Sequence, residues 1–446
     1  MATVAGFPYF PVQFNKEAAV HDRSEQSALE QFLAQGSTTD LVVISHGWNN
    51  DMEEAQTLYA NFLKVLRQAV EQASSAGLAG RTFAVMGVLW PSKKFADEEL
   101  IPSGAAGAGA VINIAVLRNK LDSLKGVFDD PNADQRLEEL KKLLPKLEDS
   151  AAARKEFTNK ARTLVSKRSV DELDGSVDFF SLPADDLLSQ LSNPISFTQP
   201  APSTESGGAA AIGEGGAARV GEGGAAGIGE FFSGLFSGVR NLLNYTTYYQ
   251  MKERAGLIGG EGVNPLLRQI KEQHPTLKLH LIGHSFGGRL VTAAVAGLNL
   301  STVVKVETLT LLQAAFSHYG FAEKWDGEND GFFRRVVTTQ AVAGPILVSH
   351  TPNDKAVGIG YAMASLIAGQ VAAGIGDKDS KYGGIGRNGI QKTPEAVDGN
   401  LLPVDGAYQF KPGKFFNLSA DNFIKDHSDI CKKEIAYAIV TAIAGV

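Results

Sequence analysis

The stretch LKLHLIGHSFGGRLV, from Leu277 to Val291, constrains the fold of this chain more than any other part. Its first half alternates large apolar residues over the length of one strand, and a helix-like run follows a cluster of glycines. Between the two halves, Gly283, Ser285 and Gly287 form the pattern G-x-S-x-G. Glycines on both sides of the serine permit a turn too tight for side chains, so the serine hydroxyl projects outward. The stretch therefore predicts a strand, a sharp turn with Ser285 at its apex, and a helix.

This pattern gains its meaning from context, because a chain with 48 glycines among 446 residues can contain it by chance. Upstream, the apolar run 41–44 is typical of a strand buried on both faces of a parallel sheet. Helical periodicity follows over 52–70, and a second strand is expected over 81–90. Strand, helix and strand joined in this way indicate parallel crossover units. The sequence thus predicts an α/β fold with a mostly parallel central sheet flanked by helices.

Other expected elements continue the same alternation. The N-terminal part predicts a Pro-containing edge strand over 7–14 and a short helix over 24–33. After residue 246 the sequence predicts helices over 264–273 and 429–443 and strands over 308–312, 345–349 and 414–418. These segments, with residues 1–92, define a core of residues 1–92 and 246–446.

Between them, residues 93–245 form an expected insertion that is mainly helical and caps the core. Helical periodicity is clearest over 111–127 and 134–147. An octapeptide then occurs three times over 207–230, as GGAAAIGE, GGAARVGE and GGAAGIGE. Glycine at this density favours a flexible linker or loop, although one Ile or Val per unit leaves a small stacked structure as an alternative.

The repeat leads into a Phe-rich segment, 231–243, whose apolar residues recur at helical spacing on one face. The simplest interpretation is a helix docked on the core. An apolar lid over an acyl or aromatic substrate and an interfacial contact with lipid are the alternatives. Under the lid interpretation Phe231, Phe232 and Phe236 are candidate substrate-binding residues.

Composition argues against several classes of partner. The 42 basic and 49 acidic residues give a net charge of -7, which does not favour a nucleic-acid partner. The single cysteine, Cys431, rules out an intrachain disulfide and a Cys-based zinc site. A secretory signal and a long uncharged apolar run are both lacking in the sequence, so we expect a cytoplasmic protein without a membrane span. Phosphate-loop, dinucleotide and H-E-x-x-H motifs are lacking as well, so no cofactor and no metal are predicted.

Ser285 needs two partners to act as a nucleophile: a base within hydrogen-bond reach and an acid that orients the base. In a parallel sheet such partners lie in loops after the carboxyl ends of later strands. Asp354 follows the strand 345–349, and His427 follows the strand 414–418. The order Ser285, Asp354, His427 is the one expected of a strand-turn-helix nucleophile in this architecture.

Competing candidates stand near the same strand ends. His318 and His350 precede Asp354 and would reverse the order. Asp326 and Asp330 follow the preceding strand and are alternative acids. His284 adjoins the nucleophile, but the turn should direct its side chain away, which favours a structural role.

An oxyanion hole of backbone amides is the remaining requirement. The residue after the nucleophile, Phe286, supplies one donor, and the loop after an earlier strand should supply the other. His46, Gly47 and Trp48 follow the strand 41–44. We expect the Trp48 amide to be the second donor, with Gly47 bringing the backbone close to the substrate. His46 is a candidate for substrate contact, although a structural turn residue is the simpler interpretation.

Several of these motifs resemble one family. The segment VISHGWNNDMEEA resembles the H-G-[YW]-N-N stretch of the α/β-hydrolase superfamily, and is similar to bacterial serine hydrolases that carry VxxHGYNN after a core strand. LWPS at 89–92, LIGHSFGG, PNDKAV and the later HSDI resemble the same set. The likeness covers 41–92 and roughly 245–446. It implies a serine esterase or lipase-like fold with Ser285, Asp354 and His427 as the triad.

The expected activity is cleavage of a carboxylic ester, with a small-molecule or lipid-like substrate. A lipase acting on long acyl chains at lipid surfaces, an acyltransferase or amidase with the same triad, and a non-enzymatic binding scaffold are the alternatives. The Gly-rich tract 374–389 is expected to be a surface loop, with a place beside the active site as the other interpretation.

Overall fold

The structure is a computed structural model that describes residues 2–48, 50–72, 77–92, 113–166, 170–192, 226–367 and 378–446. For residues 226–233, 359, 362–363 and 365–366 it describes the backbone alone.

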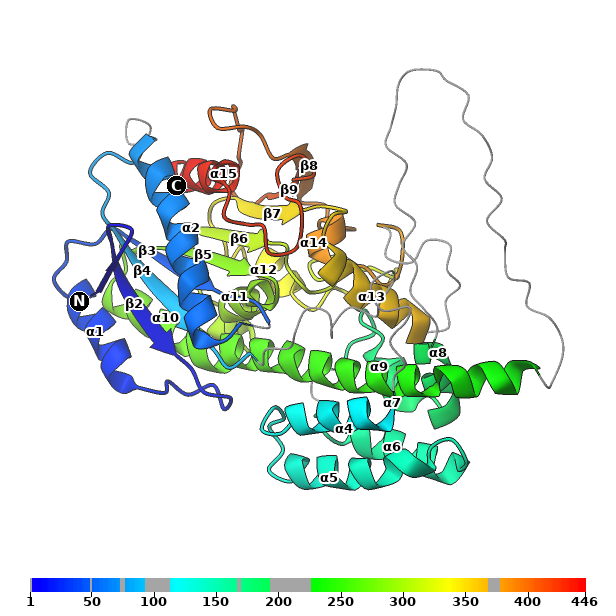
Figure 1. Ribbon diagram of the computed structural model, residues 1–446. Helices are drawn as coiled ribbons and strands as arrows, with labels where there is room; N and C mark the ends of the chain where they lie inside the picture. The colour runs from blue at the N-terminus through cyan, green and yellow to red at the C-terminus, as the bar shows by residue number, and fades with distance from the viewer. Residues whose placement is uncertain are drawn as a thin grey trace, which may run out of the picture.

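Within these ranges, a nine-stranded sheet forms the centre of the molecule, in the order β1-β2-β4-β3-β5-β6-β7-β9-β8 (Figure 1). The strands are β1 Ala2–Val4, β2 Phe7–Gln13, β3 Asp40–Ser45, β4 Phe83–Leu89, β5 Lys278–His284, β6 Thr308–Leu312, β7 Ile346–His350, β8 Ala396–Asn400 and β9 Phe415–Ser419. The β1–β2 pair is antiparallel, and every other neighbouring pair is parallel. The prediction of an α/β fold with a mostly parallel sheet flanked by helices is confirmed.

One prediction about the edge of this sheet is wrong. The segment 7–14 was expected at the edge, but β1 pairs with β2 through the register Ala2 with Tyr9 and Val4 with Phe7. Pro8 and Pro11 suggested an edge because proline donates no ladder hydrogen bond. The short β1 covers that side of β2, and β2 continues as a parallel neighbour of β4.

Helices alternate with the strands along most of the chain (Figure 1). They are α1 Arg23–Leu33, α2 Met52–Gln72, α4 Ile114–Ser123, α5 Ala133–Leu143, α6 Ala151–Arg162, α7 Ser176–Ser181, α8 Ala184–Ser192, α9 Ala226–Leu257, α10 Asn264–Gln273, α11 Phe286–Ala296, α12 Arg334–Thr338, α13 Lys355–Ile367, α14 Ile385–Asn388 and α15 Lys433–Ala444. Short 3-10 turns lie at Leu144–Lys146 and Leu300–Thr302, and a π-helical turn at Ile258–Val263 joins α9 to α10.

β3 is buried on both faces of the sheet, as its continuous apolar run predicts. Leu41 and Val43 belong to one hydrophobic cluster, together with residues of α10 and α11. Val42 and Ile44 belong to the other cluster, which α2 and α15 complete. This alternation follows from the two-residue period of a strand, and it fixes the register in which β3 lies between β4 and β5.

The long helix α9 connects the expected insertion to the core. It spans 32 residues, and the expected boundary between residues 245 and 246 falls inside it. Figure 1 shows α4, α5 and α6 on the side of α9 that faces away from the sheet, and α8 packs against α9 as well. Residues 226–230 of the octapeptide repeat form the start of α9, whereas 207–225 lie outside the described residues.

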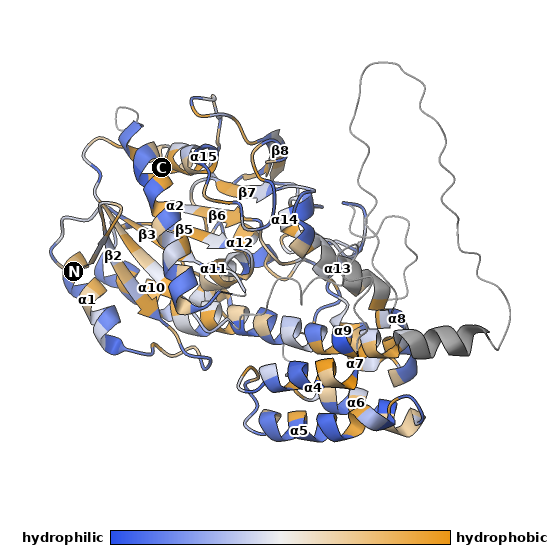
Figure 2. Cartoon of the chain, in the orientation of Figure 1, coloured by the Kyte–Doolittle hydropathy of each residue, from blue (hydrophilic) through white to orange (hydrophobic). Residues whose placement is uncertain are grey.

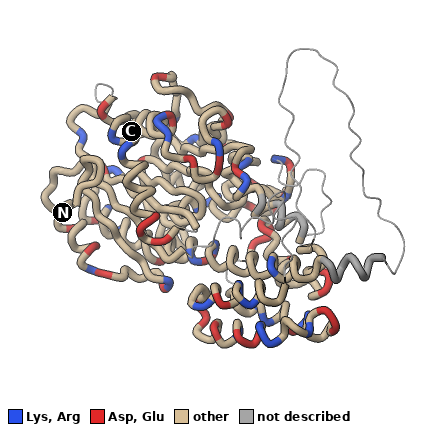
Figure 3. Tube along the Cα trace, viewed as in Figure 1, with Lys and Arg blue, Asp and Glu red and all other residues tan. Residues whose placement is uncertain are grey.

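Hydropathy and charge follow this arrangement. Figure 2 shows hydrophobic residues concentrated on the central strands. Figure 3 shows charges of both signs along α4 to α6. In the part of the chain that the structure describes, we find no helix whose length and apolarity would suffice to cross a membrane.

Candidate active site

Ser285 lies at a strained turn between β5 and α11. Its backbone has φ 56° and ψ −126°, a region that residues other than glycine seldom adopt and that raises the free energy by about 1–3 kcal/mol. The turn is held by the strand next to it: the Ser285 amide donates to the carbonyl of Leu312 at 3.0 Å, and the Ala315 amide donates to the carbonyl of Ser285 at 3.1 Å. The strand, turn and helix expected around this serine are therefore present.

Two glycines let the end of β3 approach this turn. A Cβ on Gly287 would lie 2.3 Å from the carbonyl oxygen of Ser45, so α11 can reach the end of β3 only without a side chain there. A Cβ on Gly47 would lie 2.4 Å from Cβ of Ser285 and 3.0 Å from its Oγ. The loop after β3 is thus packed directly against the candidate nucleophile, as the oxyanion-hole prediction requires.

Asp354 and His427 meet although 73 positions separate them in the chain. Nδ1 of His427 lies 2.9 Å from Oδ2 of Asp354, whose carboxylate is fully buried, while the imidazole keeps 20% of its surface exposed. Because a carboxylate only accepts, Nδ1 carries the proton and a neutral imidazole has its lone pair on Nε2. The pair therefore has the tautomer that a general base needs.

The Asp354 carboxylate is fixed from its other side as well. Its Oδ1 accepts from the backbone amide of Val357 at 3.0 Å, in the first turn of α13. Gly386, in the Gly-rich tract, lies against it, since a Cβ on Gly386 would be 2.7 Å from Oδ2. The expectation of a surface loop is wrong for this part of the Gly-rich tract, because residues 382–386, which include the start of α14, are buried next to the acid. Residues 374–377 of that tract lie outside the described residues.

The competing acids and bases have other partners. Asp326 is exposed and accepts from the amides of Glu328 and Asn329 in its own loop. Asp330 is also exposed, and it accepts from the Lys324 amide. His318 is buried, with Nε2 at 3.0 Å from the carbonyl of Ser380, and burial lowers its pKa to about 3. These contacts give each residue a local structural role.

His46 serves the backbone around it and is fully buried. Its Nε2 accepts from the Trp90 amide at 3.2 Å, so Nδ1 donates to the Gly47 carbonyl at 2.9 Å. The ring stacks on Trp90, with the ring centroids 5.4 Å apart. Burial lowers the pKa of His46 to about 4 and keeps it neutral. Both ring nitrogens therefore stabilise the turn, and neither is left for substrate.

The backbone of the same turn is held by Tyr59 of α2. Its hydroxyl accepts from the His46 amide at 2.7 Å and donates to the Val88 carbonyl at 2.6 Å. The indole nitrogen of Trp90 donates to the His46 carbonyl at 3.0 Å. The residues just before Gly47 and Trp48 are thus tied to the end of β4.

Trp48 and Phe286, the expected oxyanion donors, are neighbours. Their ring centroids lie 5.9 Å apart, and both rings contact Tyr248 of α9, at 6.3 and 5.3 Å. Phe286 is the first residue of α11, so its amide has no carbonyl partner one turn earlier within the helix. The two backbone segments that would hold an oxyanion therefore converge beside Ser285.

The comparisons with known proteins add no relatives to this picture. No protein-family model, no curated protein and no solved structure matches the chain. Among the described residues, no group of three or more His, Cys, Asp or Glu side chains is arranged to hold a metal ion.

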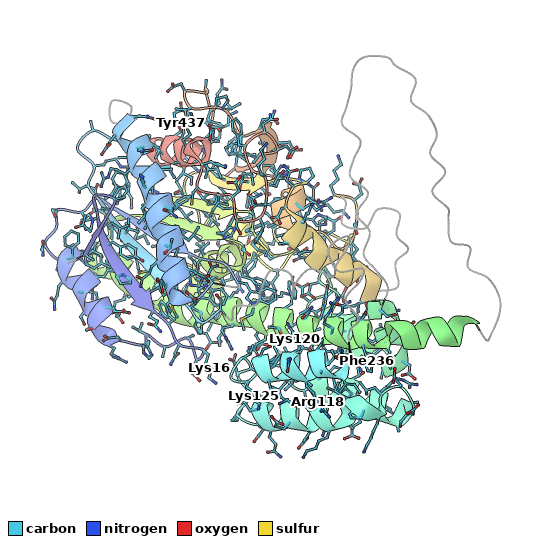
Figure 4. All side chains as sticks on the ribbon, in the orientation of Figure 1. Lys16, Arg118, Lys120, Lys125, Phe236 and Tyr437 are labelled. Carbon is cyan, nitrogen blue, oxygen red and sulfur yellow. The ribbon has the colours of Figure 1, made fainter. Side chains whose placement is uncertain are left out.

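Of the three phenylalanines expected in a lid, the structure describes the side chain of Phe236 alone. The side chains of Phe231 and Phe232 lie outside the part of the chain that the structure describes. Phe236 is half-buried and packs against the main hydrophobic cluster from α9 (Figure 4). Its neighbours Leu235 and Val239 are fully buried, which agrees with a docked helix at this point.

Sequence reasoning missed Tyr59, Tyr248 and Asn353. Asn353 directly precedes the acid, and its Nδ2 donates to the Ile424 carbonyl at 2.9 Å, three residues before His427. Tyr248 stands 37 positions before Ser285 in α9, beyond the Phe-rich segment 231–243 that the sequence predicts as helical. Only the tertiary fold brings these residues to the site, although Asn353 stands in PNDKAV, one of the segments that resemble the hydrolase family.

Proposed function

We propose that this chain is a serine hydrolase of the α/β-hydrolase type that cleaves carboxylic esters through an acyl-enzyme intermediate. Oγ of Ser285 attacks the ester carbonyl carbon while Nε2 of His427 takes the hydroxyl proton. Asp354 holds the imidazole and stabilises the imidazolium that forms. The amides of Trp48 and Phe286 bind the oxyanion.

The second half of the reaction uses the same groups. Collapse of the tetrahedral intermediate breaks the bond to the alcohol, which leaves with the proton from His427. A water molecule then attacks the acyl-enzyme, His427 takes a proton from it, and Ser285 is regenerated as the acid departs. The substrate is a small-molecule or lipid-like ester.

Two contacts carry the proposal: the 2.9 Å contact between His427 and buried Asp354, and the 2.8 Å contact of the His427 carbonyl with His284, the residue before a serine in a strained strand-to-helix turn. Each part alone has ordinary structural explanations. A buried carboxylate that orients a partly exposed imidazole, in a loop that contacts the residue before such a serine, fits the arrangement that nucleophilic catalysis needs. The chain order of the three residues also fits the family that the sequence resembles.

The test uses a fluorophosphonate probe and p-nitrophenyl esters of graded chain length. Wild-type protein should be labelled covalently and should release nitrophenol, and Ser285→Ala should lose both activities. Ser317→Ala is a matched control, because Ser317 is also buried after a core strand. Its hydroxyl oxygen accepts from the Tyr319 amide at 3.2 Å, and this is the contact that the substitution removes. Absence of labelling in the wild type, or equal labelling of Ser285→Ala, would refute the proposal.

A further inference from the structure

His284, the residue before the candidate nucleophile, contacts the candidate base. Its Nε2 lies 2.8 Å from the backbone carbonyl oxygen of His427. The two imidazole rings are also in contact, with centroids 4.9 Å apart and planes inclined by 39°. The sequence predicted that the turn would direct His284 away from the site, and the structure places it against His427.

The direction of the side chain explains this difference. Residues alternate along β5, so His284 points to the same face of the sheet as Ile282, the face that α2 and α15 cover. The connection from β9 to α15 passes over the end of that face, and it carries His427. The turn does direct His284 away from Ser285, but toward the loop that holds the base.

The hydrogen bond has a defined direction. A carbonyl oxygen only accepts, so Nε2 of His284 carries the proton and donates. Burial lowers the pKa of His284 to about 3, with smaller contributions in the same direction from the charges of His427 and His46. The ring therefore stays neutral and adds no positive charge beside the imidazolium that His427 becomes during the reaction.

Different residues contact the ring of His427, its backbone and the loop that carries it. Asp354 fixes its ring at Nδ1, and Asn353 holds the Ile424 carbonyl earlier in the same loop. The carbonyl of His427 itself is bound by His284. Within the same loop, the Ser428 amide donates to the Asp426 carboxylate. His284 thus links the base loop to the end of β5, directly before Ser285.

We propose that His284 is a positioning residue for the base: its Nε2–H holds the His427 backbone, so that the imidazole bound to Asp354 stays aligned with Ser285. This inference rests on the proposed hydrolase function. It assigns His284 a role in the rate of the chemical step, with no contact to substrate.

Two polar substitutions of similar size separate this role from simple packing. His284→Gln places an amide donor near the position of Nε2, whereas in His284→Asn the amide is too short to reach the His427 carbonyl. With the full-length chain and p-nitrophenyl butyrate, we expect Asn to lower kcat about ten- to a hundredfold with KM unchanged, the factor that follows from losing one hydrogen bond to a buried carbonyl. Gln should stay within a few-fold of wild type, and fluorophosphonate labelling rates should follow the same order.

His284→Phe gives a second measurement, because it keeps a ring against His427 and removes the hydrogen-bond donor. Its kcat should be lowered as much as that of His284→Asn. His280→Leu is the matched control, since His280 is a buried histidine four positions earlier in β5 at the far end of the strand. It should lower the thermal unfolding midpoint and leave kcat of the folded protein unchanged.

The inference is overturned if His284→Asn and His284→Gln have equal kcat, or if His284→Phe is as fast as wild type. It is also overturned if the loss of activity in His284→Asn is confined to KM. These results are distinct from a failure of the proposed function, in which wild-type protein itself takes no label and releases no nitrophenol.

Discussion

Gly47 lies so close to Ser285 that a Cβ added to Gly47 would be 2.4 Å from Cβ of the serine and 3.0 Å from its Oγ. The two residues belong to loops that follow neighbouring parallel strands, β3 and β5. Their contact brings the Trp48 amide segment to the nucleophile, and it leaves no room for a methyl group between the two backbones.

Gly47→Ala is therefore predicted to inactivate the protein while leaving the sheet intact. The methyl group must displace either Ser285 or the Trp48 segment, and a displacement of about 1 Å at a reacting centre lowers rates by about a hundredfold or more. Ester hydrolysis and probe labelling measure the loss, and circular dichroism checks the fold. Gly399→Ala in β8 is the control, because the nearest atom to its added Cβ is 3.9 Å away. Wild-type rates in Gly47→Ala would contradict the proposed oxyanion loop.

The role of Asp354 predicts a strong effect of Asp354→Asn. The asparagine oxygen can keep the bond from the Val357 amide, but its NH₂ group then faces Nδ1 of His427 and favours the wrong tautomer. We expect kcat to fall about ten-thousandfold. Asp326→Asn serves as the comparison, since Asp326 was a competing acid and bonds only within its exposed loop. Equal losses in the two variants would mean that Asp354 has no special role.

Much of this site could be predicted because its signals are local. The glycines around Ser285 encode the turn, and the apolar run of β3 encodes a strand buried on both faces. Their places after later strands predict Asp354 and His427 as partners, and the structure brings these two residues together. Their order along the chain was sufficient because parallel strands end at one edge of the sheet.

The remaining features depend on packing that the sequence does not encode locally. β8, with the sequence AVDGN, has no apolar alternation, and its pairing with β9 gives it strand geometry. The tract around Gly386 has a loop-like composition, yet residues 382–386 are buried, and a Cβ on Gly386 would lie 2.7 Å from Oδ2 of Asp354. His284 contacts His427 through a loop more than 130 positions later, so only the fold reveals the contact.

At the other end of the sheet, a buried cluster predicts how stability depends on pH. Asp40 is fully buried, and its carboxylate accepts hydrogen bonds from Nε of Arg81 at 3.0 Å and from Nε2 of His280 at 2.8 Å. Nδ1 of His280 lies 2.9 Å from the hydroxyl of Thr308. Burial alone would raise the pKa of Asp40, but hydrogen bonds from Arg81, His280 and Thr39 outweigh it and lower that pKa well below its usual range. Burial lowers the pKa of His280 and keeps the ring neutral.

Both shifts make the folded state less stable in acid. Below about pH 6.5 the unfolded chain binds a proton on His280 that the folded chain binds less readily, so the free energy of unfolding falls. The contribution of Asp40 to the free energy of unfolding is present above about pH 3.9 and is lost below that pH. Asp40→Asn should lower the free energy of unfolding at pH 7 by about 3–5 kcal/mol, because Arg81 loses its buried partner. Urea unfolding at several pH values should show this difference shrinking below about pH 4. A difference that stays constant down to pH 3 would contradict the assignment.

A buried ion pair joins α9 to the loop before α7, and we expect it to stabilise the packing of the two segments. Nζ of Lys252 contacts the carboxylate of Asp174 and lies 3.3 Å from that of Asp171, and the side chains of Lys252 and Asp174 are only 2% and 1% exposed. Lys252→Met leaves a buried carboxylate without its cation, which should lower the free energy of unfolding by about 3–5 kcal/mol. Replacing both partners, as Lys252→Met with Asp174→Leu, should recover much of the loss, because an apolar pair needs no compensating charge. Lys125→Met is the control, since Lys125 and its partner Glu138 are 42% and 47% exposed, and its effect should be small. A single Lys252→Met variant as stable as wild type would show that the pair does not hold this loop to α9.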